Sequence, residues 1–109
     1  DLSAQKNEPM VLRAAIARHI QRLYAAKRAM QAHKSDKELM ELLGSKSTYY
    51  ARKMRDSAAR LDTKWLRRTL LLCGESDVAM KSAGADRQKV LELMLLQMAA
   101  NFGEKAVRR

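Results

Sequence analysis

The segment from Val90 to Ala100, VLELMLLQMAA, is the feature that most constrains how this chain can fold. Only Glu92 and Gln97 interrupt its apolar residues. It is too short to span a bilayer, which takes about 20 apolar residues. As a helix it would carry apolar side chains nearly all round, more than one packed face can bury. Either this helix is central to a bundle, or another chain covers one of its sides.

The rest of the composition predicts an all-α protein. One proline and four glycines leave few helix breakers in 109 residues, and helix-forming Ala, Leu, Met, Lys and Arg are abundant. The length suits one domain with a real core. We therefore expect a five-helix bundle over residues 8–102, a frayed or disordered segment over residues 1–7, and a loose polar tail over residues 103–109.

Capping and stopping residues divide the chain into five helices. Ser35 and Glu38 form a capping box, S-x-x-E, and Gly44 is suited to end the helix that follows. The predicted boundaries are Asn7 or Pro9 to about Ala32, Ser35 to Gly44, Ser47 or Thr48 to about Arg60, Asp62 or Thr63 to Gly84, and Asp86 onward.

The first helix is predicted to have a core face and a basic face. Its basic side carries Arg18, Arg22 and Arg28, with Arg13 at the flank. His19 lies beside the core face, where a packed histidine is more common than a ligand. The predicted core face consists of Leu12, Ile16, Ile20, Leu23, Lys27 and Met30.

The fourth helix has a polar group within its apolar stripe. Asp77 continues the stripe of Leu66, Leu70 and Cys73. A buried carboxylate is costly unless it is bonded. Lys81 at i+4, or a basic group from another helix, is expected to satisfy it and so orient the helices.

Two further residues of this helix, Cys73 and Gly74, bear on its packing and on the redox compartment. Gly74 in its interior costs roughly 1 kcal/mol relative to alanine and offers room for a close helix contact. The lone Cys73 excludes an internal disulfide and fits a reducing compartment.

Nothing in the sequence predicts catalysis. It has no phosphate-binding glycine loop, no Cys-x-x-Cys and no histidine at metal-ligand spacing. Acidic residues Asp36, Glu38 and Glu41 lie at the start of a helix, where the helix dipole favours them. We expect neither enzyme activity nor a metal or cofactor.

A net charge of +10 raises the alternative of DNA binding. Residues 1–34 alone carry seven basic and two acidic residues. Residues 36–55 have the order of a helix-turn-helix, in which Arg52, Lys53 and Arg55 would face DNA. Such helix pairs are also common in plain bundles.

Taken together, the segments resemble the C-terminal domain of the bacterial DNA polymerase III delta subunit, a clamp-loader component. The resemblance runs from about Val11 to Leu96. It differs in the Asp77–Gly84 spacing, in Gly74 and in the turn at residues 45–47, where prolines are common. It is carried by LRAAIARHIQRLYAAKRAM, KSDKELMELLGSKSTYYARKMRDSA, ESDVAMKSAG and RQKVLELMLLQM.

This resemblance implies a function in assembly. Family members carry an AAA+-like module, a middle helical module and this third one, which joins the other subunits in a collar. The complex places the sliding clamp on primed DNA in the bacterial cytoplasm, and the delta subunit does not itself hydrolyse ATP. On this basis we expect subunit contacts at Leu93 and Leu96 and at the basic residues Arg18 and Arg22.

Overall fold

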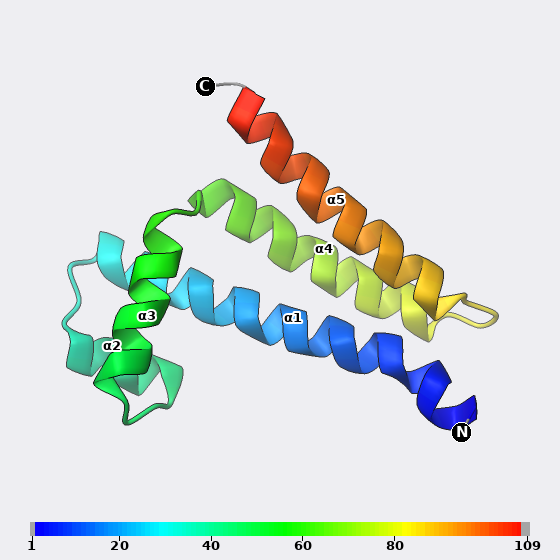
Figure 1. Ribbon diagram of the computed structural model, residues 1–109, viewed down its shortest axis with the longest axis horizontal. Coiled ribbons are helices and arrows are strands. Elements are labelled where there is room, and N and C mark those ends of the chain that lie inside the picture. Colours follow the sequence, from blue (N-terminus) through cyan, green and yellow to red (C-terminus); the bar gives the residue numbers. More distant parts are fainter. Residues whose placement is uncertain (1, 108–109) are drawn as a thin grey trace. The chain divides into compact units, whose positions relative to one another are not determined.

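The computed structural model describes the backbone of residues 2–107 and the side chains of residues 7–103. These residues contain five helices and no strand, which confirms the all-α prediction (Figure 1). The helices are α1 (Leu2–Gln31), α2 (Asp36–Leu43), α3 (Thr48–Ala59), α4 (Thr63–Lys81) and α5 (Arg87–Val107).

The chain divides into two compact units. The terminal unit consists of the chain up to Ala17 and from Arg68 onward, so it contains the start of α1, most of α4 and α5. The central unit is Arg18–Arg67, which contains the rest of α1, α2, α3 and the start of α4.

Both ends of the chain are more helical than predicted. Helix α1 begins at Leu2, earlier than the predicted start at Asn7 or Pro9, and Asp1 lies outside the described residues. The expectation that residues 1–7 are frayed stays a prediction. Pro9 removes one backbone donor without ending the helix, and its ring is buried. Asn7 is not a cap, since its Oδ1 accepts a hydrogen bond from Arg87 Nη1 at 3.4 Å.

At the other end, α5 continues to Val107, beyond the predicted boundary at residue 102. The expectation of a loose polar tail stays a prediction. The sequence there, GEKAV, contains good helix formers, and a glycine inside a helix costs only about 1 kcal/mol. The last two residues lie outside the described part of the chain.

The short helices begin and end where local chemistry predicts. Glu38 N donates to Ser35 Oγ at 3.2 Å and Ser35 N donates to Glu38 Oε1 at 3.0 Å, which completes the capping box. The backbone donor of Ser35 is the main reason why the pKa of Glu38 is lowered. Gly44 ends α2 with φ 65°, and the following Ser45 N donates back to Met40 O at 2.9 Å.

The same kind of capping holds elsewhere. Ser47 caps α3 by accepting from Tyr50 N at 3.1 Å, and Asp86 caps α5 by accepting from Lys89 N at 3.1 Å. At the end of α1, His33 takes the left-handed conformation that glycine usually supplies, with φ 55°.

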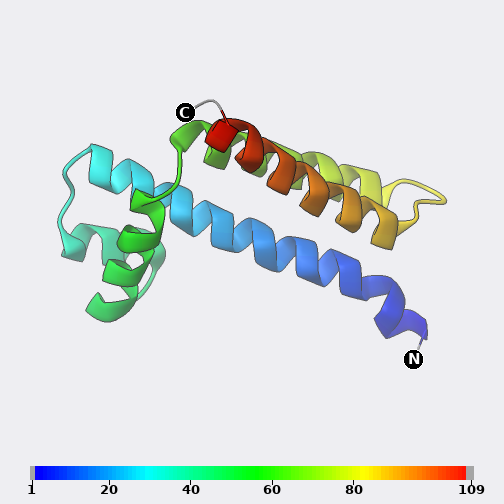
Figure 2. The same ribbon diagram turned by 45° about the horizontal axis from the view of Figure 1, so that its top comes forward.

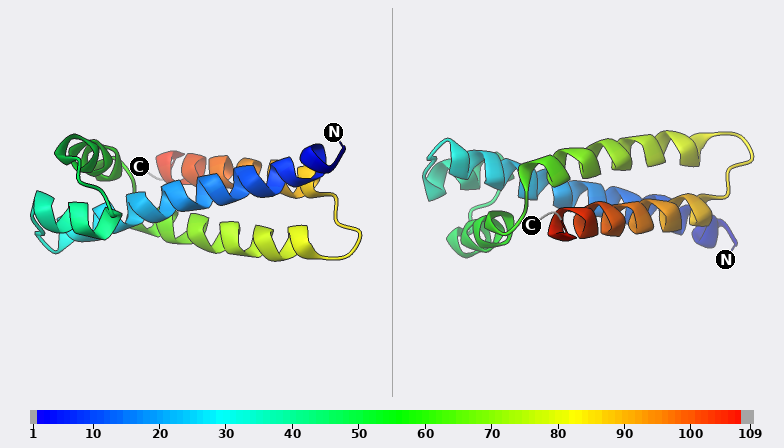
Figure 3. Two further views of the ribbon diagram at one scale, coloured as in Figure 1. Left: turned by 90° about the horizontal axis from the view of Figure 1, so that it is seen from below. Right: turned by 90° about the horizontal axis from the view of Figure 1, so that it is seen from above.

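The core of the terminal unit lies between α4, α5 and the start of α1. Its fully buried residues are Cys73, Met80, Leu91 and Met94. Helices α4 and α5 run antiparallel on either side of the loop at residues 82–86 (Figure 2 and Figure 3). Partly buried residues pack around this core, namely Met10, Ile16, Ala17, Leu72, Val90 and Met98.

The core of the central unit includes a separate set of buried side chains. Helices α2 and α3 contact each other, and Leu39 of α2 is completely buried. Small residues are prominent in this core, which consists of Ile20, Leu23, Ala26, Ala29, Leu39, Ala51, Met54, Ala58 and Leu66.

Two of the predicted core positions on α1 are wrong. Leu12 is 44% exposed, and His19 is exposed rather than packed. Pattern alone places both beside the apolar face. However, α1 packs with Met10, Ile16 and Ala17 in the terminal unit. In the central unit it is buried through Ile20, Leu23, Ala26 and Ala29. A single helical wheel averages over these two environments.

Two glycines give opposite predictions for stability. Gly44→Ala should lower the free energy of unfolding by about 1–2 kcal/mol, because alanine is disfavoured at positive φ. Gly74→Ala should raise it by up to about 1 kcal/mol, because a Cβ there meets no atom within 4 Å and the helix gains propensity. Urea unfolding of both variants measures this. Equal effects would contradict the backbone assignment at Gly44.

Candidate assembly surface

Helix α5 is apolar on two sides, and only one of them is inside the protein. The inner row contains Leu91, Met94 and Asn101, all buried. On the outer row Leu93 is 56% exposed and Leu96 is 66% exposed. Leu95 and Phe102 are exposed as well. Within the described residues, α5 is therefore a core helix on one side and an uncovered apolar helix on the other.

Polar bonds fix the orientation of α5. Near its start, Arg87 Nε donates to the carbonyl of Met80 at 3.1 Å. Near its end, Asn101 Oδ1 accepts from Arg68 Nη2 at 3.3 Å and from Gln97 Nε2 at 3.0 Å. A rotation of α5 about its axis would break the two bonds to α4, those of Arg87 to Met80 and of Arg68 to Asn101, so the outer leucines are held outward. Helical periodicity does not predict the bond of Arg68 to Asn101, because the two residues are 33 positions apart, nor the bond of Arg87 to a backbone carbonyl.

Asp77 is bonded by both groups that the sequence suggested. Lys81 Nζ lies 3.0 Å from Oδ2, and Arg13 Nη2 of α1 lies 3.3 Å from Oδ1. The hydrogen bond from Lys81, with the charge of Arg13, lowers the pKa of Asp77. Its side chain is 29% exposed, so the group lies at the edge of the core rather than in its midst.

Arg13 also connects α1 to α4 through the backbone. Its Nη1 donates to the carbonyl of Cys73 at 3.3 Å. The thiol of Cys73 is buried, and this burial raises its pKa. A thiol that stays protonated and covered is a core group rather than a nucleophile.

The two basic residues of α1 that were predicted to contact other subunits lie in the central unit. Arg18 and Arg22 are exposed, whereas Leu93 and Leu96 belong to the terminal unit. The four predicted interface residues thus form two separate sets.

The three basic residues of α3 differ in their surroundings. Arg55 Nη1 lies 2.6 Å from Asp36 Oδ1, and its Nη2 donates to the carbonyl of Lys34 at 3.2 Å. Arg52 Nε lies 3.3 Å from Asp36 Oδ2. Lys53 Nζ lies 5.6 Å from the ring centroid of Tyr49. Arg55 therefore holds α3 to the start of α2, and its guanidinium is engaged within the fold.

Among the residues that the structure describes, no three His, Cys, Asp or Glu side chains lie together in a way that could hold a metal ion. None of the described helices combines the length and the apolar character needed to cross a membrane.

These features define an all-helical domain with an apolar helix face that its own core does not cover. The family model for the DNA polymerase III delta subunit, C-terminal domain, matches residues 1–98. The chain therefore belongs to this family of clamp-loader components, as its sequence segments predict. Searches of curated proteins and of solved structures found no match.

The Asp77 cluster gives a pH-dependent prediction. Asp77→Asn should lower the free energy of unfolding at neutral pH, because it removes the charge that Lys81 and Arg13 bond. Since the folded pKa is lowered, the stabilisation is present above the unfolded pKa and is lost as pH falls through the folded one. Urea unfolding from pH 7 to pH 2 measures it, and parallel curves for the two proteins would contradict the assignment.

The α3 residues give a second prediction. Arg55→Gln should lower the free energy of unfolding by about 1–3 kcal/mol, because Asp36 loses a charged partner. Lys53→Gln, the matched control, should have little effect on folding.

Titration of a DNA duplex tests the alternative function, DNA binding by α3. If α3 binds DNA, Lys53→Gln should weaken binding and reduce its salt dependence by about one unit of slope.

Proposed function

We propose that this domain assembles the clamp loader, and that the outer face of α5 is a contact with another subunit. The observation that carries this proposal is the exposure of Leu93 and Leu96 on a helix whose opposite side is core. Full burial of either side chain in a complex would contribute at most about 1.5–3 kcal/mol, because each is already partly covered within the domain.

The distribution of exposed apolar residues supports an interface in the terminal unit. Two of the large exposed hydrophobic residues, Leu42 and Tyr49, belong to the central unit. The terminal unit holds the others, which are Val11, Leu12, Leu71, Val78, Leu93, Leu95, Leu96 and Phe102. Apolar side chains are typical of the buried centre of a protein interface, which favours an interface in the terminal unit over one in the central unit.

Arg18 and Arg22 are suited to speed association with a partner rather than to stabilise the complex. They are exposed on α1 in a chain of net charge +10. Exposed charges contribute more to the rate and selectivity of association than to its free energy. The proposal therefore assigns them to the approach of an acidic partner surface.

The proposal places the chemistry of clamp loading elsewhere in the complex. The domain would hold the delta subunit in the loader, while other parts of the assembly contact the sliding clamp and primed DNA. No catalytic function is assigned to these residues. Direct DNA binding is the weaker alternative, since Arg55 and Arg52 are engaged with Asp36 and only Lys53 of the three basic residues on α3 is left without a carboxylate partner among the described residues.

An interface test follows from the two kinds of exposed leucine. Leu93→Asp and Leu96→Asp should each weaken association with the other purified loader subunits at least tenfold, because a carboxylate would be buried in the contact. Leu42→Asp is the matched control, since Leu42 is 62% exposed but lies in the central unit. Sedimentation velocity of the full-length subunit with its partners measures the complex. Normal assembly of both α5 variants would exclude the α5 interface.

A further inference from the structure

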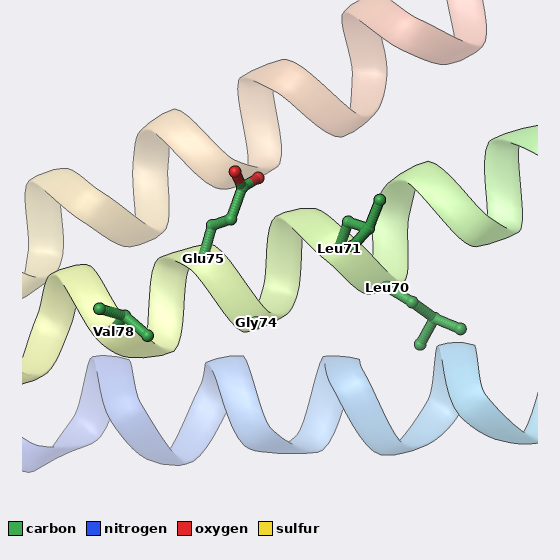
Figure 4. Close-up of a pocket in the computed structure, with 5 residues that line it drawn as sticks. All are labelled: Leu70, Leu71, Gly74, Glu75 and Val78. Atoms are coloured by element: carbon green, nitrogen blue, oxygen red, sulfur yellow. The ribbon is translucent and has the colours of Figure 1, made fainter.

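The charge of helix α4 changes along its length. Around Gly74 its open surface is lined by apolar residues and by the carboxylate of Glu75 (Figure 4). Toward the start of the helix, residues 63–73 contain three basic residues and no acidic one. Residues 9–35, which include most of α1, contain six basic residues and no Asp or Glu. The place where these two segments meet therefore favours an anion.

Two hydrogen bonds join the second half of α1 to the start of α4. Arg67 Nε of α4 donates to the hydroxyl of Tyr24 on α1 at 3.1 Å. Gln31 Nε2 of α1 donates to the Oγ1 of Thr63, the first residue of α4, at 2.8 Å. All four residues belong to the central unit. The side chains at this junction are therefore held in place before any ligand binds.

Two guanidinium groups at this junction have donors that the protein does not use. Arg28 lies one helical turn after Tyr24, and its Nη1 donates to Gln31 Oε1 at 3.3 Å. Among the described residues, neither Arg28 nor Arg67 forms an ion pair with a carboxylate. Both arginines are exposed, and each uses one nitrogen in a bond to another side chain. Since a guanidinium carries five N–H donors, most of them remain for a ligand.

Tyr24 adds a hydroxyl donor between the two arginines. Its oxygen accepts from Arg67, and no described residue accepts its proton, so the O–H group can donate to a ligand. The hydrogen bond from Arg67, with the charges of Arg67 and Arg28, lowers the pKa of Tyr24. Both charges thus act on the hydroxyl, which is suited to a charge-assisted bond with an oxyanion.

We propose that Tyr24, Arg28 and Arg67 form a binding site for a phosphate group, between the second half of α1 and the start of α4. The donors come from two helices, which suits a tetrahedral phosphate better than a planar carboxylate, whose two oxygens one guanidinium satisfies. Free phosphate and the backbone of a nucleic-acid strand present this chemistry alike. The site does not depend on the proposed function, because Leu93 and Leu96 belong to the terminal unit.

Binding is measured with the full-length subunit at low ionic strength and two probes. Phosphorus NMR follows inorganic phosphate, and fluorescence anisotropy follows a labelled single-stranded oligonucleotide. Arg67→Gln should weaken binding at least about tenfold and reduce the salt slope for the oligonucleotide by about 0.7. Arg28→Gln and Tyr24→Phe should each weaken it about threefold, and they test the site even if Arg67→Gln fails to fold. Binding of either probe identifies the source of the phosphate, whereas binding of neither would overturn the proposal.

Two control variants separate this site from the general charge of the chain. Lys37→Gln removes the same charge from an exposed position on α2 and should leave binding within about twofold. Arg67→Lys keeps the charge but loses the planar fork, so it should weaken binding about threefold. If Lys37→Gln acts as strongly as Arg67→Gln, or if Arg67→Lys binds like the wild type, the proposal is overturned. Loss of oligonucleotide binding in Lys53→Gln but not in Arg67→Gln would assign the contact to α3 and overturn it as well.

The outcomes separate this inference from the proposed function. Leu93→Asp should bind both probes as the wild type does, because it changes the terminal unit. If Leu93→Asp and Leu96→Asp assemble normally while Arg67→Gln loses phosphate binding, the α5 interface is excluded and the phosphate site stands. If Leu93→Asp prevents assembly and the wild type binds neither probe, the phosphate site is excluded and the α5 interface stands.

Discussion

Helix α5 has more apolar surface than the core of the terminal unit can bury, and the rest of the structure depends on this excess. The row with Leu91 and Met94 completes the core of the terminal unit. Once it is buried, the row with Leu93 and Leu96 must face outward, because the two lie on different sides of one helix. Packing inside the domain thus creates the surface from which we infer assembly.

Hydrogen bonds and ion pairs determine which apolar residues of α5 are exposed. Apolar packing is non-directional and would tolerate a small rotation of a helix. The bonds of Arg87 to Met80 and of Asn101 to Arg68 are directional, and they select one orientation of α5. The bonds of Arg13 to Asp77 and to the carbonyl of Cys73 do the same for α4 and the start of α1. Charged and amide side chains therefore set which apolar residues are exposed.

Positive charge is used in two ways in this chain. Arg13 and Arg55 lie within the fold, where each bonds a carboxylate and a backbone carbonyl from another element. Arg18 and Arg22 remain exposed on α1. A net charge counts both kinds equally, which explains why the charge of this chain suggests DNA binding more strongly than its structure does.

The sequence by itself determined what depends on neighbours in the chain: the all-α class, the capping box at Ser35, the stop at Gly44, and Lys81 as a partner for Asp77. These are short-range effects of backbone geometry and i to i+4 spacing. Only the tertiary structure decided that Leu12 and His19 face outward, that Arg55 bonds Asp36, and which row of α5 is buried. A helical pattern fixes the angle between residues, but the neighbouring helices fix which angle points to the core.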